Sequence, residues 1–138
     1  MDVFGTAKRS EIMSRIRGKH TAPERKVRSL VHAMGYRFRL HRADLPGKPD
    51  LVFPSRRKVI FVHGCFWHSH GTCRKGRSRP ATRAEFWGAK ICSNKRRDRN
   101  ERARLRRKGW RTLVVWECEL SRDMQRVAKK VTAFLEGL

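Results

Sequence analysis

The sequence contains few acidic residues. Asp and Glu number 12 against 35 Lys and Arg, so the formal net charge of the 138-residue chain is +23. Such an excess of positive charge favours a polyanionic partner, and nucleic acid is the strongest candidate. An anionic membrane surface is the alternative, but a surface-binding helix concentrates its apolar residues on one exposed face. Here the cations are distributed over the whole chain, which favours a nucleic-acid-binding groove.

Long hydrophobic runs are also missing. No segment approaches the roughly 18 apolar residues of a membrane span, and no apolar segment follows the N-terminus as in a secretion signal. The four Cys of a chain without an export signal favour metal binding or free thiols over disulfides. We therefore expect a cytoplasmic, nucleoid-associated protein with no membrane partner. The 38% share of hydrophobic residues excludes a disordered basic tail and is sufficient for a folded domain.

The spacing of apolar residues predicts a mixed β-sheet flanked by helices, an α/β fold. Thr21 and Glu24 form a capping box that begins a helix, and Gly35 ends it. Strands are expected at residues 36–40, 50–53, 58–63 and 110–116. The last of these is the most apolar, and we expect it at the centre of the sheet.

Two further helices are expected in the second half of the chain. A second capping box at Thr82 begins a long basic helix that ends near Gly109, and Ser121 caps the C-terminal helix. Residues 71–80 form an exposed basic loop, and residues 1–20 form a basic N-terminal arm or helix. Residues 21–138 then form a single domain.

Asp50 and His63 are the first candidate site residues. Asp50 follows Pro49 at the beginning of one predicted strand, and His63 lies at the end of the next. A carboxylate fixed at a strand end is a suitable Mg²⁺ ligand, because Mg²⁺ takes one or two rigid oxygens together with waters and phosphate. Taken alone, an Asp after Pro is more often a turn residue.

A cluster of His and Cys follows directly. Cys65, His70 and Cys73 have a spacing that can surround one tetrahedral Zn²⁺, and a closed site needs a fourth ligand. Cys118 is favoured over Cys92, because strands 58–63 and 110–116, if adjacent, bring their ends together. The alternative is a set of unrelated thiols and surface imidazoles. His63 and His68 then remain for proton transfer near neutral pH.

Aromatic residues lie among the cations. Phe66 and Trp67 lie between the zinc-ligand candidates, and Phe86 and Trp87 lie in the first turn of the long basic helix. Exposed aromatic rings among cations can stack on bases or insert between base pairs. Core packing is the alternative for Phe86, and it is the expected role of Trp110 and Trp116.

Four segments of the chain resemble one known family. Taken in order, they are LPGKPDLV, VIFVHGCFWH, PATRAEFW and GWRTLVVWEC. In this order they look like the very-short-patch (Vsr) DNA mismatch endonucleases, over about residues 8–120. The resemblance implies a PD-(D/E)XK-type nuclease core with a structural zinc site. It also implies Mg²⁺-dependent nicking of one strand of duplex DNA 5′ to the T of a T·G mismatch. Such mismatches arise by deamination of 5-methylcytosine made by a cytosine-5 methyltransferase.

The resemblance also implies roles for individual residues. Asp50 would bind Mg²⁺ together with the backbone carbonyl of Val62, while Glu24 and His63 would hold metal-bound waters. His68 would be the general acid/base. The zinc ligands would be Cys65, His70, Cys73 and Cys118. The side chains inserted at the mismatch would be Phe66, Trp67 and Trp87 from the major groove and Met13 and Ile16 from the minor groove.

We therefore expect a monomeric endonuclease acting on T·G mismatches in very-short-patch repair. A restriction-type nuclease that cuts intact duplex at a methyltransferase site is one rival. A non-catalytic, zinc-stabilised DNA-binding module is another. The module would keep the Cys and aromatic residues but would need neither Asp50 nor His68.

Overall fold

The computed structural model describes residues 21–65, 68, 70–71, 73–77 and 83–137. The predicted arm at 1–20, with Met13 and Ile16, lies outside the described residues, as do Phe66 and Trp67. Among the described helices, none is both long enough and apolar enough to cross a membrane.

A four-stranded mixed sheet forms the centre of the structure. Its strands are β1 (Arg39–Leu40), β2 (Leu51–Phe53), β3 (Lys58–His63) and β4 (Arg111–Trp116), and they lie in the order β1-β2-β3-β4. The first three strands pair antiparallel, whereas β3 and β4 pair parallel. A parallel pair needs a long crossover connection, which helix α4 provides.

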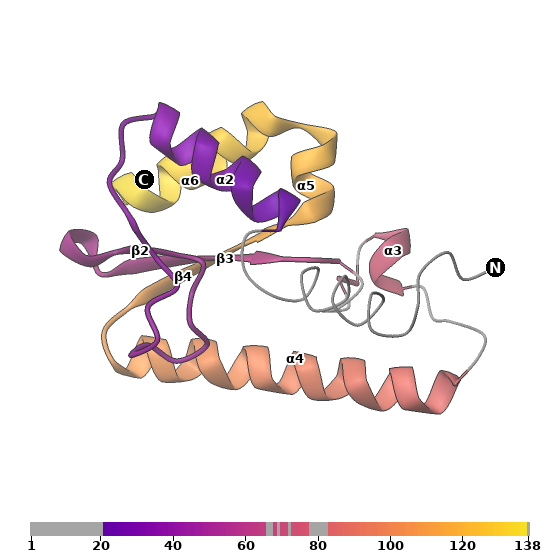
Figure 1. Ribbon diagram of the computed structural model, residues 1–138. Coiled ribbons are helices and arrows are strands. Elements are labelled where there is room, and N and C mark those ends of the chain that lie inside the picture. The colour runs from indigo at the N-terminus through magenta and orange to yellow at the C-terminus, as the bar shows by residue number, and fades with distance from the viewer. Residues whose placement is uncertain (1–20, 66–67, 69, 72, 78–82, 138) are drawn as a thin grey trace, which may run out of the picture.

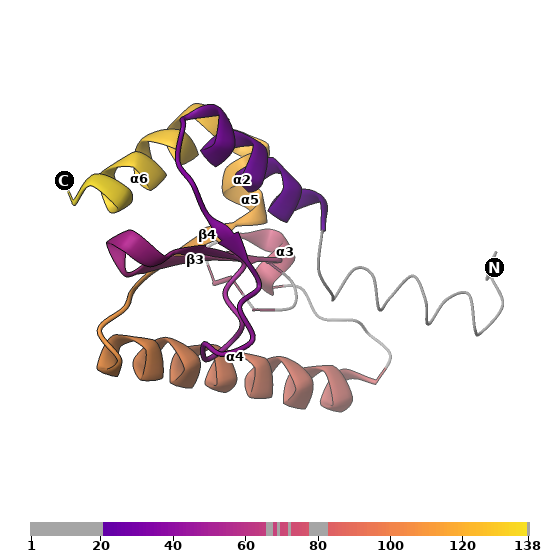
Figure 2. The same cartoon turned by 60° about the vertical axis from the view of Figure 1, so that its left-hand side comes forward.

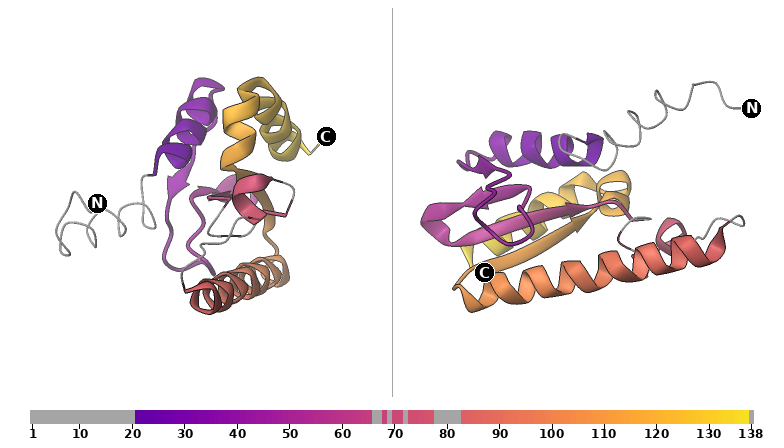
Figure 3. Two further views of the ribbon diagram at one scale, coloured as in Figure 1. Left: turned by 90° about the vertical axis from the view of Figure 1, so that its right-hand side faces the viewer. Right: turned by 60° about the horizontal axis from the view of Figure 1, so that its bottom comes forward.

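Helices cover both faces of this sheet (Figures 1 and 2). The described helices are α2 (Ala22–Ala33), α3 (Arg74–Arg77), α4 (Ala84–Arg107), α5 (Glu117–Arg122) and α6 (Met124–Glu136), with a short 3₁₀ turn at Pro54–Arg56. Figure 3 shows α2, α5 and α6 together on one face and α4 alone on the other. The expected mixed sheet flanked by helices is confirmed.

The alternating side chains of the strands build a separate core on each face. Leu51 and Ile60 pack with Val27 and Val31 of α2 and with the apolar face of α6. The neighbouring strand residues instead face α4, where the buried residues are Val52, Val59, Phe61, Leu105 and Trp110. The two layers hold β2 and β3 rigidly, and both strands lead into the site described below.

The first predicted helix is confirmed, and its cap has the expected form. Thr21 is the N-cap residue of α2, and its hydroxyl accepts a hydrogen bond from the Glu24 amide at 3.4 Å. The helix ends at Gly35, whose φ of 88° is a left-handed conformation that glycine adopts without a Cβ clash.

Two predicted helix starts are wrong. The predicted cap Thr82 lies outside the described residues, and the N-cap residue of α4 is Arg83 in a left-handed conformation. The Arg83 guanidinium stacks on the Phe86 ring at 4.2 Å. The hydroxyl of Ser121 bonds within α5 to the Glu117 carbonyl. Asp123 caps α6 instead, because its carboxylate accepts from the Arg126 amide.

The expected central position of residues 110–116 is also wrong, because β4 is an edge strand. The strand is apolar because helices cover both of its faces, not because it is central in the sheet. Leu113 and Val115 pack toward the α2 and α6 side, and Val114 packs toward the α4 side. Within predicted strand 36–40 only Arg39–Leu40 pairs with β2, and predicted loop 71–80 contains the single turn α3.

Candidate functional site

A carboxylate cluster forms where α2 begins and β2 starts. The antiparallel register of β2 and β3 brings Asp50 beside β3, and Asp50 Oδ2 accepts a hydrogen bond from the Val62 amide at 2.7 Å. Glu24, in the first turn of α2, is only 2% exposed, and its Oε2 accepts from the Arg28 guanidinium at 2.7 Å. The structure therefore brings together Asp50, Glu24 and the backbone of Val62.

His41 is a member of this cluster that the sequence did not suggest. Its Nε2 lies 2.5 Å from Glu24 Oε1 and 3.7 Å from Asp50 Oδ1. One ligand atom from each of Glu24, His41 and Asp50 lies within 4.8 Å of the others. The oxygens of Glu24 and Asp50 are therefore close enough to share one cation.

The electrostatics of Asp50 fit a cation in this position. The pKa of Asp50 is raised to about 8, chiefly by burial and also by the hydrogen bond and charge of Glu24, against the opposing effects of the Val62 amide and Arg28. Two carboxylates this close disfavour a second negative charge, whereas a divalent cation between them would favour both charges. The carboxylate oxygens of Glu24 and Asp50 are the ligand type that Mg²⁺ prefers.

A histidine–carboxylate pair lies beyond the end of β3. His68 Nδ1 lies 2.5 Å from Asp98 Oδ2 of α4, and the His63 and His68 rings stack with centroids 3.8 Å apart. The hydrogen bond at Nδ1 leaves Nε2 of His68 as the ring atom directed away from Asp98, and it fixes the orientation of the ring.

The pKa shifts separate the roles of these groups. Burial, together with the nearby His68, lowers the pKa of His63 to about 3 despite the opposing charge of Asp98, so His63 is neutral at physiological pH. Burial works to raise the pKa of Asp98, but the hydrogen bond and charge of His68 outweigh it, so the pKa falls below its ordinary value. His63 Nδ1 has no hydrogen-bond partner among the described residues.

The Cys and His cluster lies beside these histidines. Register pairs His63 of β3 with Trp116 of β4, so the segments that follow the two parallel strands are neighbours. Cys65 Sγ and Cys118 Sγ lie 3.7 Å and 3.3 Å from His70 Nδ1. The ligand atoms of Cys65, His70, Cys73 and Cys118 all lie within 4.8 Å of one another. Cys92 is exposed on α4.

The environment of this cluster fits a soft metal ion. The pKa of the Cys65 thiol is raised to about 12, chiefly by burial and also by hydrogen bonds with the Cys73 and Cys118 thiols. Burial lowers the pKa of His70, which keeps its imidazole neutral as a ligand must be. The His70 ring also stacks on Trp116 at 4.2 Å, and three sulfur donors with one imidazole are typical of zinc.

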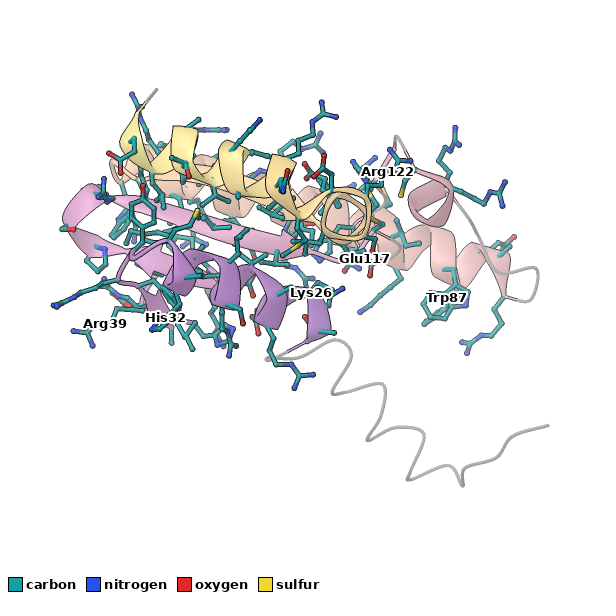
Figure 4. The ribbon with its side chains drawn as sticks, turned by 90° about the horizontal axis from the view of Figure 1, so that it is seen from above. Lys26, His32, Arg39, Trp87, Glu117 and Arg122 are labelled. Atoms are coloured by element: carbon teal, nitrogen blue, oxygen red, sulfur yellow. The ribbon has the colours of Figure 1, made fainter. Side chains whose placement is uncertain are left out.

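The predicted DNA-contacting residues are only partly described. Trp87 is half-buried near the N-terminal end of α4, on the opposite side of the molecule from Arg39 and His32 (Figure 4). Its ring meets that of Phe86 edge-on at 5.3 Å, and Phe86 is 46% exposed, so Phe86 is not a core residue. Trp110 is buried, as expected of a core residue.

Sequence reasoning missed Asp98 and His41. Asp98 had a usable signal, because it falls on the same side of α4 as Ile91, Asn94 and Leu105, all of which are buried. A carboxylate on the buried side of a basic helix needs a partner. His41 offered no comparable signal, because it contacts residues brought near only by the packing of α2 against the sheet.

The fold is that of an endonuclease catalytic domain. The structure is similar to the catalytic domain of homing endonuclease I-Bth0305I, with a TM-score of 0.58 over 83% of this chain and 94% of that chain. The sequence identity is 21%, so this likeness shows the fold alone.

The sequence matches place the chain in a family. Residues 1–75 match the family model of the DNA mismatch endonuclease Vsr. The Type II nicking enzyme V.XorIIP of Xanthomonas oryzae pv. oryzae is 56% identical over 87% of each chain. The DNA mismatch endonuclease Vsr of Escherichia coli K12 is 49% identical over 86% of this chain and 75% of its own. The chain belongs to the Vsr family, and it is a DNA endonuclease.

Proposed function

We propose that this endonuclease nicks one strand of duplex DNA 5′ to the T of a T·G mismatch and so initiates very-short-patch repair. The observation that carries the proposal is the Glu24–Asp50 carboxylate cluster at the β2–β3 edge, in a chain of the Vsr family. The mismatch would arise from deaminated 5-methylcytosine, which links the enzyme to a cytosine-5 methyltransferase. The enzyme would act in the cytoplasm as a monomer.

In this proposal the carboxylate cluster holds the catalytic Mg²⁺. Asp50 and the backbone carbonyl of Val62 would bind it, and Glu24 and His63 would hold its waters. Bound Mg²⁺ lowers the pKa of a water molecule and neutralises charge on the scissile phosphate. The amide of Val62 fixes the Asp50 carboxylate, which keeps one oxygen directed at the site.

His68 would transfer the proton as the general acid/base. The Asp98 carboxylate holds the ring by Nδ1 and would stabilise the imidazolium that forms when Nε2 takes a proton. Stacking on His63 restricts the ring to one plane. Asp98 is a positioning residue in this scheme, since it contacts His68 and acts through it.

Zinc would have a structural role. Cys65, His70, Cys73 and Cys118 would bind it in a closed tetrahedral site. Such a site would join the segment after β3 to the segment after β4 and would stiffen the chain that carries Phe66 and Trp67.

DNA would be held by charge and recognised by insertion. We propose that residues 21–138 form the nuclease domain, while the arm at 1–20 carries Met13 and Ile16 to the minor groove. Phe66, Trp67 and Trp87 would enter from the major groove. Insertion costs a few kcal/mol of unstacking, and a weakened wobble pair lowers that cost. This difference gives a physical basis for preferring a mismatch.

The test is nicking of an end-labelled duplex with one T·G pair, compared with T·A and C·G duplexes of the same sequence. We expect one cut 5′ to the T in the presence of Mg²⁺, none with EDTA, and little on matched DNA. Equal cutting of matched duplex would refute the proposed role in mismatch repair and favour a restriction-type nuclease. Binding without cutting would favour the non-catalytic module.

A further inference from the structure

His41 occupies an unusual backbone conformation at the end of β1. Its φ is 46°, in the left-handed region, and Lys48 at the other end of the loop before Asp50 has a φ of 45°. Residues with a Cβ seldom adopt this conformation, and the free-energy cost must be offset by the contacts it permits. The conformation accompanies a His41 side chain that is only 9% exposed.

The contacts of His41 identify which ring atom carries a proton. Nε2 lies 2.5 Å from Glu24 Oε1, and Asp50 Oδ1 lies 3.7 Å from the same nitrogen. An ionised carboxylate can only accept a hydrogen bond, so when Glu24 is ionised Nε2 carries the hydrogen and donates it to Glu24. The other oxygen of Glu24 accepts from Arg28 at 2.7 Å.

Glu24 is therefore held from two sides by donors from two different elements. Arg28 lies one turn further along α2, whereas His41 reaches Glu24 from the end of β1. A Glu side chain has three rotatable bonds, and one donor alone leaves the plane of the carboxylate free to turn. Two donors on its two oxygens fix that plane beside Asp50.

We infer that His41 is a positioning residue for the catalytic cation site, an inference that rests on the proposed function of the Glu24–Asp50 cluster. His41 orients Glu24 so that its carboxylate faces the place where Asp50 holds the cation. Groups that orient ligands in this way are worth about 10- to 100-fold in metal affinity. His41 acts through Glu24 and does not touch the scissile phosphate.

Three variants separate this role from simple packing. In His41→Gln the side-chain amide nitrogen reaches about as far as Nε2 and still donates a hydrogen bond. His41→Leu fills similar space without a donor. His41→Asn is polar, but its amide stops short of Glu24. His32→Gln is the matched control, because His32 is an exposed histidine in the last turn of α2.

The experiment measures Mn²⁺ and Mg²⁺ binding to the full chain by titration calorimetry without DNA, with thermal unfolding recorded for each variant. We expect His41→Leu and His41→Asn to weaken cation binding by about 10- to 100-fold, and His41→Gln and His32→Gln to bind as the wild type does. Wild-type affinity in both His41→Leu and His41→Asn would overturn the inference. So would an equal loss in His41→Gln, or a wild type that binds no cation.

Nicking assays on the wild type keep this inference separate from the proposed function. A wild type that binds the cation but does not prefer T·G duplex would refute the proposed substrate and leave the His41 result standing. Wild-type cation affinity in His41→Leu and His41→Asn, together with T·G nicking by the wild type, would refute only the role of His41. On T·G duplex we expect His41→Leu to require more Mg²⁺ for half-maximal nicking, with His41→Gln restoring the wild-type requirement.

Discussion

Replacing Asp98 with Asn removes the negative charge that faces His68 while keeping the shape of the side chain. His68 Nδ1 lies 2.5 Å from Asp98 Oδ2, and the Asp98 side chain is 10% exposed, so little water screens this interaction. The amide oxygen of Asn can still accept a hydrogen bond, but it cannot stabilise a positive ring. A general acid/base contributes about 10²- to 10⁴-fold in rate, so we expect single-turnover nicking to slow by about 10²-fold.

The same variant has a defined effect on stability. Hydrogen bonds to charged groups contribute roughly 1.5–3 kcal/mol, and we expect the free energy of unfolding to fall by about 1.5 kcal/mol at pH 7. The pKa of Asp98 is lowered in the folded state, so its contribution is present above the ordinary carboxyl pKa of about 3.9 and is lost as pH falls. The stability difference between wild type and Asp98→Asn should therefore narrow below about pH 4.

The assay compares single-turnover nicking rates, urea unfolding and DNA affinity. Glu101→Gln is the matched control, because Glu101 lies one turn further along α4, is 21% exposed and pairs with Arg97 at 3.9 Å, while its charge interaction with His68 is weaker than that with Arg97. We expect the Asp98→Asn, His68→Ala double variant to nick no more slowly than His68→Ala, since the two residues act as a unit. Wild-type nicking by Asp98→Asn, or equal slowing in Glu101→Gln, would refute the reasoning.

Three further predictions concern the zinc site and DNA binding. Metal analysis should find one zinc per chain, and Cys118→Ser should lose the zinc and unfold more easily. Cys92→Ser should change neither the zinc content nor the stability, because Cys92 is exposed, and the reverse pattern would show that Cys118 is not the fourth ligand. The affinity for DNA should fall steeply with salt concentration, with a slope steeper than about −4 in a plot of the logarithm of the binding constant against that of the salt concentration, because each contacted phosphate contributes about −0.9. An affinity that does not change with salt would contradict a phosphate-dominated interface. Trp67→Ala should keep the zinc and weaken T·G binding by about one to two powers of ten, because stacking contributes roughly 1–3 kcal/mol, and it should weaken binding to matched duplex much less. Equal losses of affinity on both duplexes, with a large fall in Tm, would show that Trp67 is a core residue.

The local patterns of the sequence predicted the strands well. The bounds of β3, Lys58–His63, agree with the expected strand, because its apolar residues lie between a basic turn and a glycine. The sequence also predicted that strands 58–63 and 110–116 are neighbours, and the pairing of β3 with β4 confirms it. That register places Cys118, rather than Cys92, beside Cys65.

Contacts between distant segments were harder to predict. The edge position of β4 depends on which side of β3 the α4 crossover returns to, and hydrophobicity alone does not report that choice. His41 reaches Glu24 only because β1 ends beneath the first turn of α2 in a left-handed backbone conformation. Asp98 could have been found from its helical spacing, but its partner His68 could not.

The nicking activity of Asp50→Asn, measured with DNA affinity on the same T·G duplex, tests most directly whether the carboxylate cluster is the catalytic centre. Asp44→Asn is the matched control, because Asp44 lies in the same loop, is 62% exposed and pairs with Arg42. We expect Asp50→Asn to bind the duplex as the wild type does and to produce no detectable nick, while Asp44→Asn nicks normally. Nicking by Asp50→Asn at the wild-type rate would contradict the assignment of this cluster as the catalytic centre.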